Sequence, residues 1–256
     1  MKDLFSLKGR TALITGGSRG IGKMIAEGFL TQGAKVYITA RKGSALEETA
    51  QELSKLGMCI PIAGNASGAD GAKSLAASYL KHEQKLDILV NNAGAAWGAE
   101  FDEFPESGWD KVVDLNMKTP FFLAQALHSA MKAAATKERP GKIINIASID
   151  GVSVNMQETY SYAASKAGLI HLTKRMAMRL IQDNIVVSAI APGAFASDMN
   201  RMARDHGDAV AQAIPAKRIG ETEDMAGAAL FLASRAGDYV VGSTLIVDGG
   251  VAYARG

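Results

Sequence analysis

The chain has 256 residues, which is enough for one large domain with a sizeable buried core. Hydrophobic residues make up 48% and charged residues 21%, and a net charge of +2 without any basic run argues against a nucleic-acid-binding surface. No apolar stretch approaches the roughly 20 residues that a membrane span needs. Residues 1–10 lack the apolar run of a signal peptide, so we expect a cytoplasmic protein.

Cysteine and histidine indicate neither a disulfide nor a metal site. Cys59 is the only cysteine in the chain, which excludes an internal disulfide. The four histidines are scattered, and none occurs in a spacing typical of metal ligands. We therefore expect no metal.

Strand-like and helix-like segments alternate along the chain. In chain order they are strand 10–15, helix 20–32, strand 35–40, helix 44–56, strand 59–63, helix 69–82, strand 87–90, helices 106–115 and 119–136, strand 142–147, helix 158–182, strand 185–191, helix 222–234 and strand 243–247. Thr119-Pro120 is typical of an N-cap followed by proline at the first helical position, so we expect a new helix to start there.

Seven strands alternating with helices predict an α/β fold with a seven-stranded parallel sheet and helices on both faces. Right-handed crossovers then make it a doubly wound, Rossmann-like domain. No linker or repeat divides the chain, so we expect a single domain over residues 1–256. The irregular stretch 197–217 lies within this pattern, and we interpret it as a loop-and-helix lid over the substrate.

A glycine-rich turn joins the first strand to the first helix. Its sequence is Thr15-Gly16-Gly17-Ser18-Arg19-Gly20-Ile21-Gly22. Glycines 16, 20 and 22 let the backbone turn tightly and approach a pyrophosphate, while the helix directs its N-terminal N–H groups at that anion. The position between a strand and a helix indicates a dinucleotide-binding turn, including Ser18, rather than a purely structural one.

The end of the second strand indicates which dinucleotide is bound. An acidic residue there would bind the ribose 2′-hydroxyl of NAD. This chain has Arg41 and Lys42 instead, and Arg41 can pair with a 2′-phosphate through charge-assisted hydrogen bonds. Arg19 in the glycine turn can reach the same phosphate. We therefore expect NADP(H) rather than NAD(H), although either arginine alone is also compatible with a solvated surface charge.

Asn91-Asn92-Ala93-Gly94 follows the fourth strand, where small Ala93 and Gly94 leave room for a flat ring. Tyr162 and Lys166 lie four residues apart on the long helix, so they share a face. A neighbouring ammonium, together with the nicotinamide cation of the oxidised complex, is expected to lower the pKa of the phenol toward the range of a general acid or base. Tyr160 meets Ala164 one turn on, and we interpret it as a packing or substrate contact.

Two further polar residues stand at strand and helix ends. Ser148 follows the strand 142–147, where its hydroxyl can hold a carbonyl oxygen opposite Tyr162. Asn116 precedes the expected helix start, where its amide can fix a water that relays protons to Lys166. Considered in isolation, each is equally well explained as an ordinary strand-end serine or helix-end asparagine.

Together these residues resemble the classical short-chain dehydrogenases/reductases. The shared pieces, in family order and spacing, are the turn at 15–22, residues 91–94, Asn116, Ser148, Tyr162 with Lys166, and Pro192-Gly193. The resemblance implies a catalytic tetrad of Asn116, Ser148, Tyr162 and Lys166, in which Lys166 also binds the nicotinamide ribose.

The same resemblance implies further cofactor contacts. It places Ile21, Asn92, Pro192 and Gly193 along the cofactor and Ser197 near the carboxamide, where many relatives carry threonine. Asn65-Ala66 occupies the adenine-side position that is often Asp-Val, and the asparagine can still hydrogen-bond adenine.

Within the family, the chain is most similar to 3-oxoacyl-thioester reductases, including the rhamnolipid-associated type. The finer shared features are Trp97-Gly98, Ser107-Gly108-Trp109, the run 190–193 and Ile214-Pro215. This likeness implies hydride transfer from NADPH to a 3-oxoacyl group carried by acyl carrier protein or CoA. It also implies a homotetramer, built through the long helices and the C-terminal strand, or a homodimer.

Two other functions remain open at this point. Relatives with near-identical motifs act on sugars, steroids and small ketones, so the substrate can be another alcohol or ketone. A protein of another class, a catalytically idle NADP(H) sensor, would be expected to lose Tyr162 or Lys166, and this chain keeps both.

Overall fold

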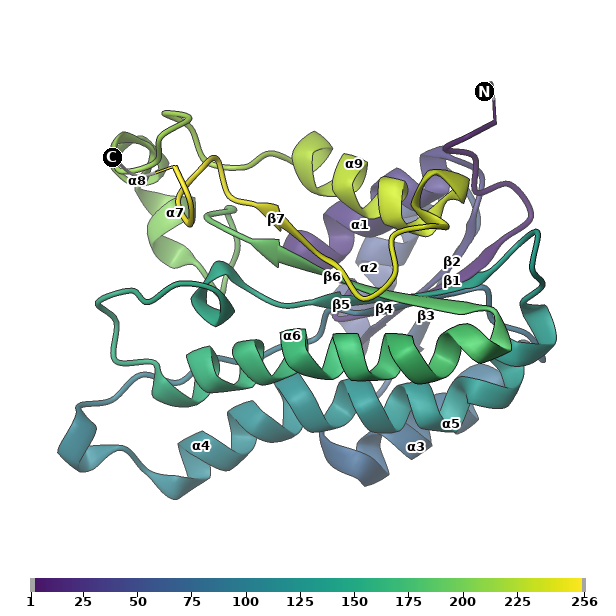
Figure 1. The fold of residues 1–256 in the computed structure, drawn as a ribbon, viewed down its shortest axis with the longest axis horizontal. Coiled ribbons are helices and arrows are strands. Elements are labelled where there is room, and N and C mark those ends of the chain that lie inside the picture. Colours follow the sequence, from purple (N-terminus) through teal and green to yellow (C-terminus); the bar gives the residue numbers. More distant parts are fainter. Residues whose placement is uncertain (1–2, 255–256) are drawn as a thin grey trace.

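Seven parallel strands form one twisted sheet in the computed structural model, which describes residues 3–254 (Figure 1). The strands are β1 (Thr11–Thr15), β2 (Lys35–Ala40), β3 (Cys59–Ala63), β4 (Ile88–Asn91), β5 (Gly141–Ile146), β6 (Ile185–Pro192) and β7 (Thr244–Val247). Their order across the sheet is β3-β2-β1-β4-β5-β6-β7. The predicted doubly wound parallel sheet is therefore confirmed.

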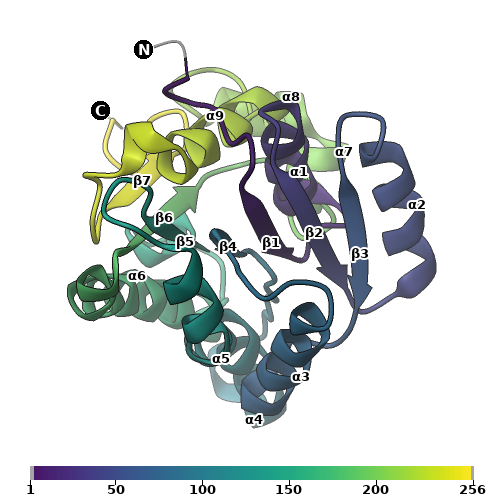
Figure 2. The ribbon, with the colours of Figure 1, turned by 90° about the vertical axis from the view of Figure 1, so that its right-hand side faces the viewer.

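Helices cover both faces of the sheet (Figure 2). In chain order they are α1 (Gly20–Thr31), α2 (Gly43–Leu53), α3 (Gly68–Leu80), α4 (Glu106–Val113), α5 (Thr119–Ala134), α6 (Tyr160–Leu180), α7 (Arg201–Asp205), α8 (Gly207–Gln212) and α9 (Thr222–Ala233). Helices α1, α2 and α9 pack on one face, and α3, α5 and α6 pack on the other. Within residues 3–254, no helix has the length and apolar character needed to cross a membrane.

The strands are apolar on both sides because each face is buried under helices. In β1, Ala12 and Ile14 join the core beneath α1, α2 and α9, while Leu13 between them joins the core beneath α3 and α5. Alternation of this kind follows from the period of two along a strand. Because all pairings in the sheet are parallel, the carboxyl ends of the strands lie at the same edge.

Helix α5 begins at Thr119, as expected, but Thr119 is not an N-cap after a break in the chain. Helix α4 continues through a wide π-helical turn (Asp114–Lys118) directly into α5, and Thr119 has helical backbone angles. The N–H of Thr119 bonds to the carbonyl of Asp114, five residues back. Pro120 has no N–H to donate, and a widened turn accommodates that loss without ending the helix.

The predicted lid contains two short helices, α7 and α8. Its two ends lie together, because Phe195 and Gly220 form an isolated parallel bridge in which the N–H of Gly220 donates to the carbonyl of Ala194 at 2.9 Å. Residues 197–217 therefore form an excursion closed at its base, located at the edge where the strands end (Figure 1).

Candidate active site

The sheet reverses its winding between β1 and β4, which lie side by side although β2 and β3 separate them in the chain. Crevices at such switch points, outside the carboxyl ends of the strands, are where open α/β sheets bind ligands. The glycine turn after β1 and Asn92 after β4 flank this point, and Ser148 and Gly193 follow the next two strands. The predicted site residues are thus gathered at one edge.

The glycine turn is packed too tightly for side chains at its critical positions. A Cβ on Gly22 would stand 2.3 Å from the carbonyl oxygen of Gly16 and 2.4 Å from Nδ2 of Asn92. Gly16 has a φ of +67°, in the left-handed region that favours glycine. The turn opens into α1 at Gly20, so backbone N–H groups and the positive end of a helix meet there. This arrangement fits a dinucleotide pyrophosphate.

Asn92 and Thr15 hold the turn in place. The amide of Asn92 donates to the carbonyl oxygens of Thr15 at 2.8 Å and Gly16 at 3.0 Å. The hydroxyl of Thr15 accepts the backbone N–H groups of Asn92 at 3.0 Å and Ala93 at 2.9 Å. The side chain of Asn92 therefore ties β4 to β1. The role of Thr15 was not predicted from the sequence.

The two arginines expected at a 2′-phosphate differ in their surroundings. Arg41 is exposed after β2 and forms no ion pair with any residue between positions 3 and 254. Arg19 forms an ion pair with Asp198 of the lid, which no sequence pattern indicated. Asn65 is exposed after β3, where its Oδ1 accepts the N–H of Ser67, and Ala66 is buried beside it.

Ser148, Tyr162 and Lys166 converge beyond the end of β5. The Nζ of Lys166 donates to the carbonyl of Ile146 at 2.7 Å and lies 5.5 Å from the centre of the Tyr162 ring. A hydrogen bond from Ser148 acts on the Tyr162 phenol. Ser148 also caps the short 3₁₀ turn Ile149–Gly151 by accepting the N–H of Asp150 at 3.2 Å. The proximity of the Lys166 ammonium to the Tyr162 ring agrees with the i, i+4 spacing of these two residues.

The protonation states differ from the expectation based on the sequence. Burial raises the pKa of Tyr162 to about 12, with the charge of Asp150 also raising it and the Ser148 hydrogen bond lowering it. Burial lowers the pKa of Lys166 to about 8, against a smaller opposing effect of Asp150. The predicted lowering of the tyrosine pKa by the ammonium is therefore wrong for this state of the protein. The ammonium is directed to a carbonyl, and desolvation of the phenol dominates.

Asn116 is buried in the π-helical turn and fully engaged. Its Nδ2 donates to the carbonyl of Ala95 at 2.9 Å and to the hydroxyl of Ser165 at 3.1 Å, and its Oδ1 accepts the N–H of Ala95 at 2.8 Å. Both N–H groups of the amide are used, so neither is free to donate to a relay water. It instead fixes the segment after β4 to α6. The backbone carbonyl of Asn116 is the group left without an α-helical donor, because Pro120 follows four residues later.

Two positioning interactions were missed from the sequence. The Ser165 hydroxyl donates to the carbonyl of Tyr162 at 2.8 Å, so it joins Asn116 to the turn that carries the phenol. Asn145, buried in β5, accepts from Asn91 at 2.8 Å and donates to Thr173 at 2.9 Å. Apart from the Ser165–Tyr162 bond, these pairs are distant in sequence, and no local spacing signals them.

The remaining predicted cofactor residues also lie at this edge. Gly193 follows Pro192 at the end of β6, and its N–H bonds to the carbonyl of Val247 at 2.9 Å. A Cβ on Gly94 would stand 3.3 Å from Oδ1 of Asn116. Ile21 packs against the core beneath α1. Ser197 lies over the glycine turn, 3.1 Å from where a Cβ on Gly20 would be.

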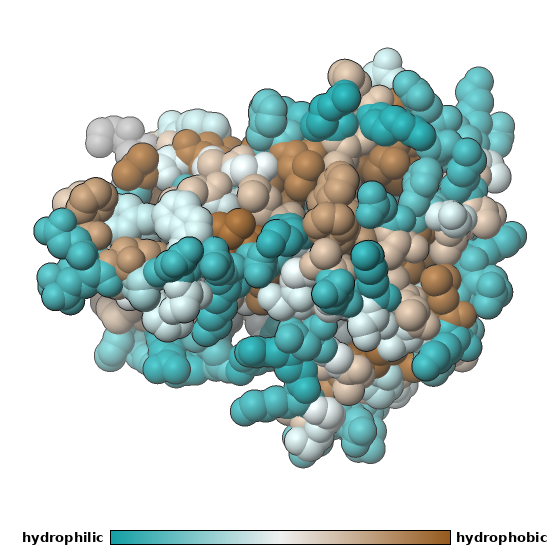
Figure 3. Space-filling model, turned by 90° about the horizontal axis from the view of Figure 1, so that it is seen from below, coloured by the Kyte–Doolittle hydropathy of each residue, from teal (hydrophilic) through white to brown (hydrophobic). Residues whose placement is uncertain are grey.

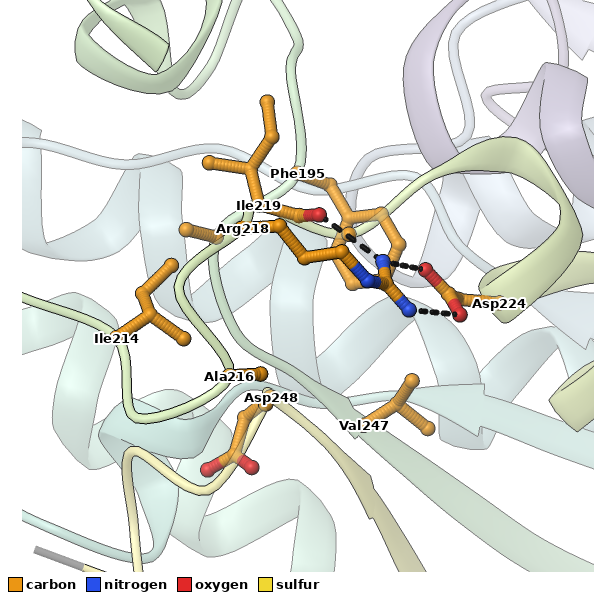
Figure 4. Close-up of a pocket in the computed structure, with 11 residues that line it drawn as sticks. Phe195, Ile214, Ala216, Arg218, Ile219, Asp224, Val247 and Asp248 are labelled. Carbon is orange, nitrogen blue, oxygen red and sulfur yellow. Dashed lines mark hydrogen bonds and ion pairs between the residues drawn. The ribbon is translucent and has the colours of Figure 1, made fainter. Parts of the chain in front are cut away.

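A small cavity of about 80 Å³ lies at the base of the lid, and none of the predicted catalytic side chains lines it (Figure 4). Phe195, Ile214 and Val247 supply apolar walls. The guanidinium of Arg218 bonds to Asp224 at the start of α9, with one of the two contacts at 2.9 Å. The cavity therefore belongs to the anchorage of the lid rather than to the catalytic cluster.

Fold and site together define a class of dinucleotide-dependent oxidoreductases. The family model described as enoyl-(acyl carrier protein) reductase matches residues 16–252, and the chain belongs to the short-chain dehydrogenases/reductases. The rhamnolipids biosynthesis 3-oxoacyl-[acyl-carrier-protein] reductase of Pseudomonas aeruginosa is 43% identical over 253 residues, which are 98% of this chain and 99% of that protein.

Other relatives carry different names. The 2-dehydro-3-deoxy-D-gluconate 5-dehydrogenase of Bacillus subtilis is 38% identical over 98% of this chain and 97% of its own. Among solved structures, the RhlG/NADP active-site complex of Pseudomonas aeruginosa has a TM-score of 0.95 at 43% identity, covering 98% of this chain and 100% of that one. The family is thus established, while the names of the relatives span acyl and sugar substrates.

Proposed function

We propose that this protein is an NADP(H)-dependent reductase that converts the carbonyl of a 3-oxoacyl thioester to a hydroxyl group. The observation that carries the proposal is the convergence of Ser148, Tyr162 and Lys166 beside a glycine turn that fits a pyrophosphate. The exposed Arg41 and the absence of a carboxylate at that position support NADP(H) over NAD(H).

The proposed cofactor residues each have a defined task. Gly16, Ser18, Gly20, Ile21 and Gly22 would hold the pyrophosphate. A second group would bind the ends of the cofactor: Arg19 and Arg41 the 2′-phosphate, Asn65 and Ala66 the adenine, and Asn92, Ala93, Gly94, Pro192, Gly193 and Ser197 the nicotinamide half. When bound, NADPH supplies the hydride.

The side chains of the tetrad supply the polar support. The hydroxyl of Ser148 positions the carbonyl oxygen of the substrate, and Tyr162 donates a proton to that oxygen. The raised pKa keeps the phenol protonated at neutral pH, as a donor must be, but also makes it a weaker acid than a free tyrosine. Lys166 is expected to bind the nicotinamide ribose and to replenish the proton, while Asn116 positions α6 through Ser165.

The surroundings of the site support an apolar substrate chain. Three segments that follow β4, β5 and β6 lie at the same edge (Figure 1) and expose large hydrophobic side chains. These exposed side chains are Phe101 after β4, Val154 (97% exposed) and Met156 (100% exposed) after β5, and Met199 and Met202 after β6. Groups of exposed apolar side chains mark binding sites, and an acyl chain would cover them.

A sugar ketone is the second candidate because of one residue. Asp150 is half-buried two residues after Ser148, where its carboxylate can accept hydrogen bonds from substrate hydroxyls. A dehydrogenase of a gluconate derivative is also among the relatives.

A panel of carbonyl substrates separates the two candidates. NADPH consumption would be followed with 3-oxoacyl thioesters of increasing chain length, on CoA and on acyl carrier protein, and with keto-gluconates. We expect kcat/KM to rise with chain length and to exceed the value for the sugar acids. A preference for keto-gluconates would overturn the acyl assignment and favour the Asp150 alternative.

The proposed assembly is a homotetramer or homodimer. Figure 3 views the molecule from the side of α3, α4 and α5 and shows hydrophobic residues among hydrophilic ones on this face. Phe121 on α5 and Met178 on α6 are exposed, and β7 is an edge strand of the sheet. Covering an edge strand by a second copy removes its unpaired backbone groups. Sedimentation analysis would test this, and a monomer at micromolar concentration would contradict it.

A further inference from the structure

The first residues of the lid lie on the glycine turn. A Cβ on Gly20 would stand 3.1 Å from Cβ of Ser197, so the backbone that enters the lid passes directly over the start of α1. The next residue is Asp198, whose carboxylate forms an ion pair with Arg19 of the same turn. An anion from the lid is therefore already bound beside the place where the cofactor phosphates are expected.

Asp198 has a second partner that does not belong to the cofactor site. Its Oδ1 accepts from Arg204 of α7 at 2.6 Å, while Oδ2 faces Arg19. Arg204 also bonds to the neighbouring Asp205 at 2.7 and 3.0 Å. The lid thus carries two carboxylates bound to one arginine, but only Asp198 also contacts the glycine turn.

A guanidinium bound to a carboxylate is not fully available to a phosphate. Arg19 presents a limited set of N–H donors, and the ion pair with Asp198 engages one of its terminal nitrogens. A phosphate monoester offers more charge and more acceptor oxygens than a carboxylate, so it can displace Asp198. Arg204 keeps the displaced carboxylate paired, which lowers the cost of the exchange.

We propose that Asp198 competes with the 2′-phosphate of the cofactor for Arg19 and thereby makes the lid a determinant of cofactor affinity. The inference rests on the proposed function, because it takes Arg19 as a phosphate partner. Release of Asp198 frees the start of the lid from the glycine turn only when a cofactor with a 2′-phosphate enters. A cofactor without that phosphate leaves the ion pair in place.

The size of the effect follows from the exposure of the pair. The side chains of Arg19 and Asp198 are 70% and 44% exposed, so solvent and salt screen their attraction. Removing the carboxylate is expected to tighten NADP⁺ binding about two- to fivefold, the range of one exposed ion pair. NAD⁺ binding should change by less than about twofold, because it does not require Arg19.

The test is calorimetric titration of NADP⁺ and of NAD⁺ into the substrate-free protein at low ionic strength. Asp198→Asn removes the competing charge and keeps the side-chain shape. Asp205→Asn is the matched control, because it removes a lid carboxylate that binds Arg204 but does not contact Arg19. We expect tighter NADP⁺ binding in Asp198→Asn alone, and no further tightening when Asp198→Asn is added to Arg19→Gln. Thermal unfolding of each variant confirms that it is folded.

The outcomes separate this inference from the proposed function. If Arg19→Gln weakens NADP⁺ binding but Asp198→Asn leaves it unchanged or weaker, Asp198 positions Arg19 and the competition is overturned while the cofactor assignment stands. Equal gains in Asp198→Asn and Asp205→Asn would also overturn it, since they indicate a general charge effect. If Arg19→Gln binds NADP⁺ as well as the unmodified protein does, the assignment of Arg19 and the competition both fail.

Discussion

Gly22 lies so close to Gly16 that a Cβ on Gly22 would stand 2.3 Å from the carbonyl oxygen of Gly16. The contact closes the glycine turn on itself, and the amide of Asn92 binds the same carbonyl oxygen from β4 at 3.0 Å. The shape of the candidate pyrophosphate site therefore depends on the absence of one methyl group.

Gly22→Ala should destabilise the protein by about 1–3 kcal/mol, the usual cost of overpacking, and abolish NADP⁺ binding. The helical position makes this result informative, because alanine normally stabilises a helix interior by about 0.5–1 kcal/mol relative to glycine. Gly227→Ala is the matched control, since Gly227 lies in α9 with no atom within 4 Å of an added Cβ. Denaturant unfolding should show opposite signs for the two variants. Stabilisation by both would contradict the close packing of the turn.

The sheet was predictable because its signals are local. Every strand is a short apolar run next to a glycine or polar turn, and helices separate the strands by the distances that parallel crossovers need. Gly16, Gly20 and Gly22 were recognisable for the same reason. The backbone conformation that they permit is a property of single residues in a fixed local pattern.

What the sequence could not show depends on contacts between distant segments. Thr119-Pro120 has the local pattern of a helix start, yet the Thr119 hydroxyl accepts the N–H of Gly68 at 2.9 Å and the helix runs through it. The engagement of Asn116 by Ala95 and Ser165 likewise follows from tertiary packing. The tyrosine pKa was mispredicted because burial cannot be judged from spacing alone.

Arg41→Asp should weaken NADP⁺ binding by at least about tenfold and change NAD⁺ binding much less. The substitution replaces the proposed partner of the 2′-phosphate with a repelling charge, and one lost charge-assisted bond costs about 1.5–3 kcal/mol. Lys55→Asp makes the same charge change at another exposed position and serves as the control. Equilibrium binding of both cofactors measures the effect. Equal losses for the two cofactors would remove Arg41 from the phosphate site.

Reductive turnover should fall as the pH rises through about 8. The ammonium of Lys166 is proposed to replenish the proton that Tyr162 donates, so turnover requires Lys166 to be protonated. Burial lowers the pKa of Lys166 to about 8, so the ammonium loses its proton well before the Tyr162 phenol does. Asp150 opposes this lowering, so Asp150→Asn should move the fall in kcat to lower pH. Asp110→Asn, an exposed carboxylate on α4, should leave the profile unchanged.

Unfolding does not explain such a fall, because the linkage has the opposite sign. Between about 8 and 10.5 the unfolded chain retains the proton on Lys166 that the folded protein releases. Lys166 therefore contributes more to the free energy of unfolding as the pH rises through this window. Measuring kcat and unfolding over the same pH range tests both statements. A flat profile of kcat up to pH 10 would contradict the role of Lys166.

The lid should exchange its backbone hydrogens faster than the sheet in the free protein. Residues 197–217 form an excursion that is closed at its base by the Phe195–Gly220 bridge, and lids of this kind close over bound ligands. NADPH together with substrate should slow exchange across 197–217 and leave α9 unchanged as the internal reference. Rapid exchange that neither ligand alters would rule out closure.

The most direct test of the account is single-turnover oxidation of NADPH by Tyr162→Phe, with cofactor binding measured separately. If Tyr162 donates the proton, turnover should fall by about two to four orders of magnitude while NADPH affinity stays unchanged, because only the hydroxyl is removed. Lys166→Ala should damage both turnover and binding. Tyr160→Phe is the control, since that hydroxyl bonds to Glu158 at 2.9 Å and its ring packs against Phe101. The assignment of the proton donor would be contradicted if Tyr160→Phe lost turnover while Tyr162→Phe kept a near-normal rate.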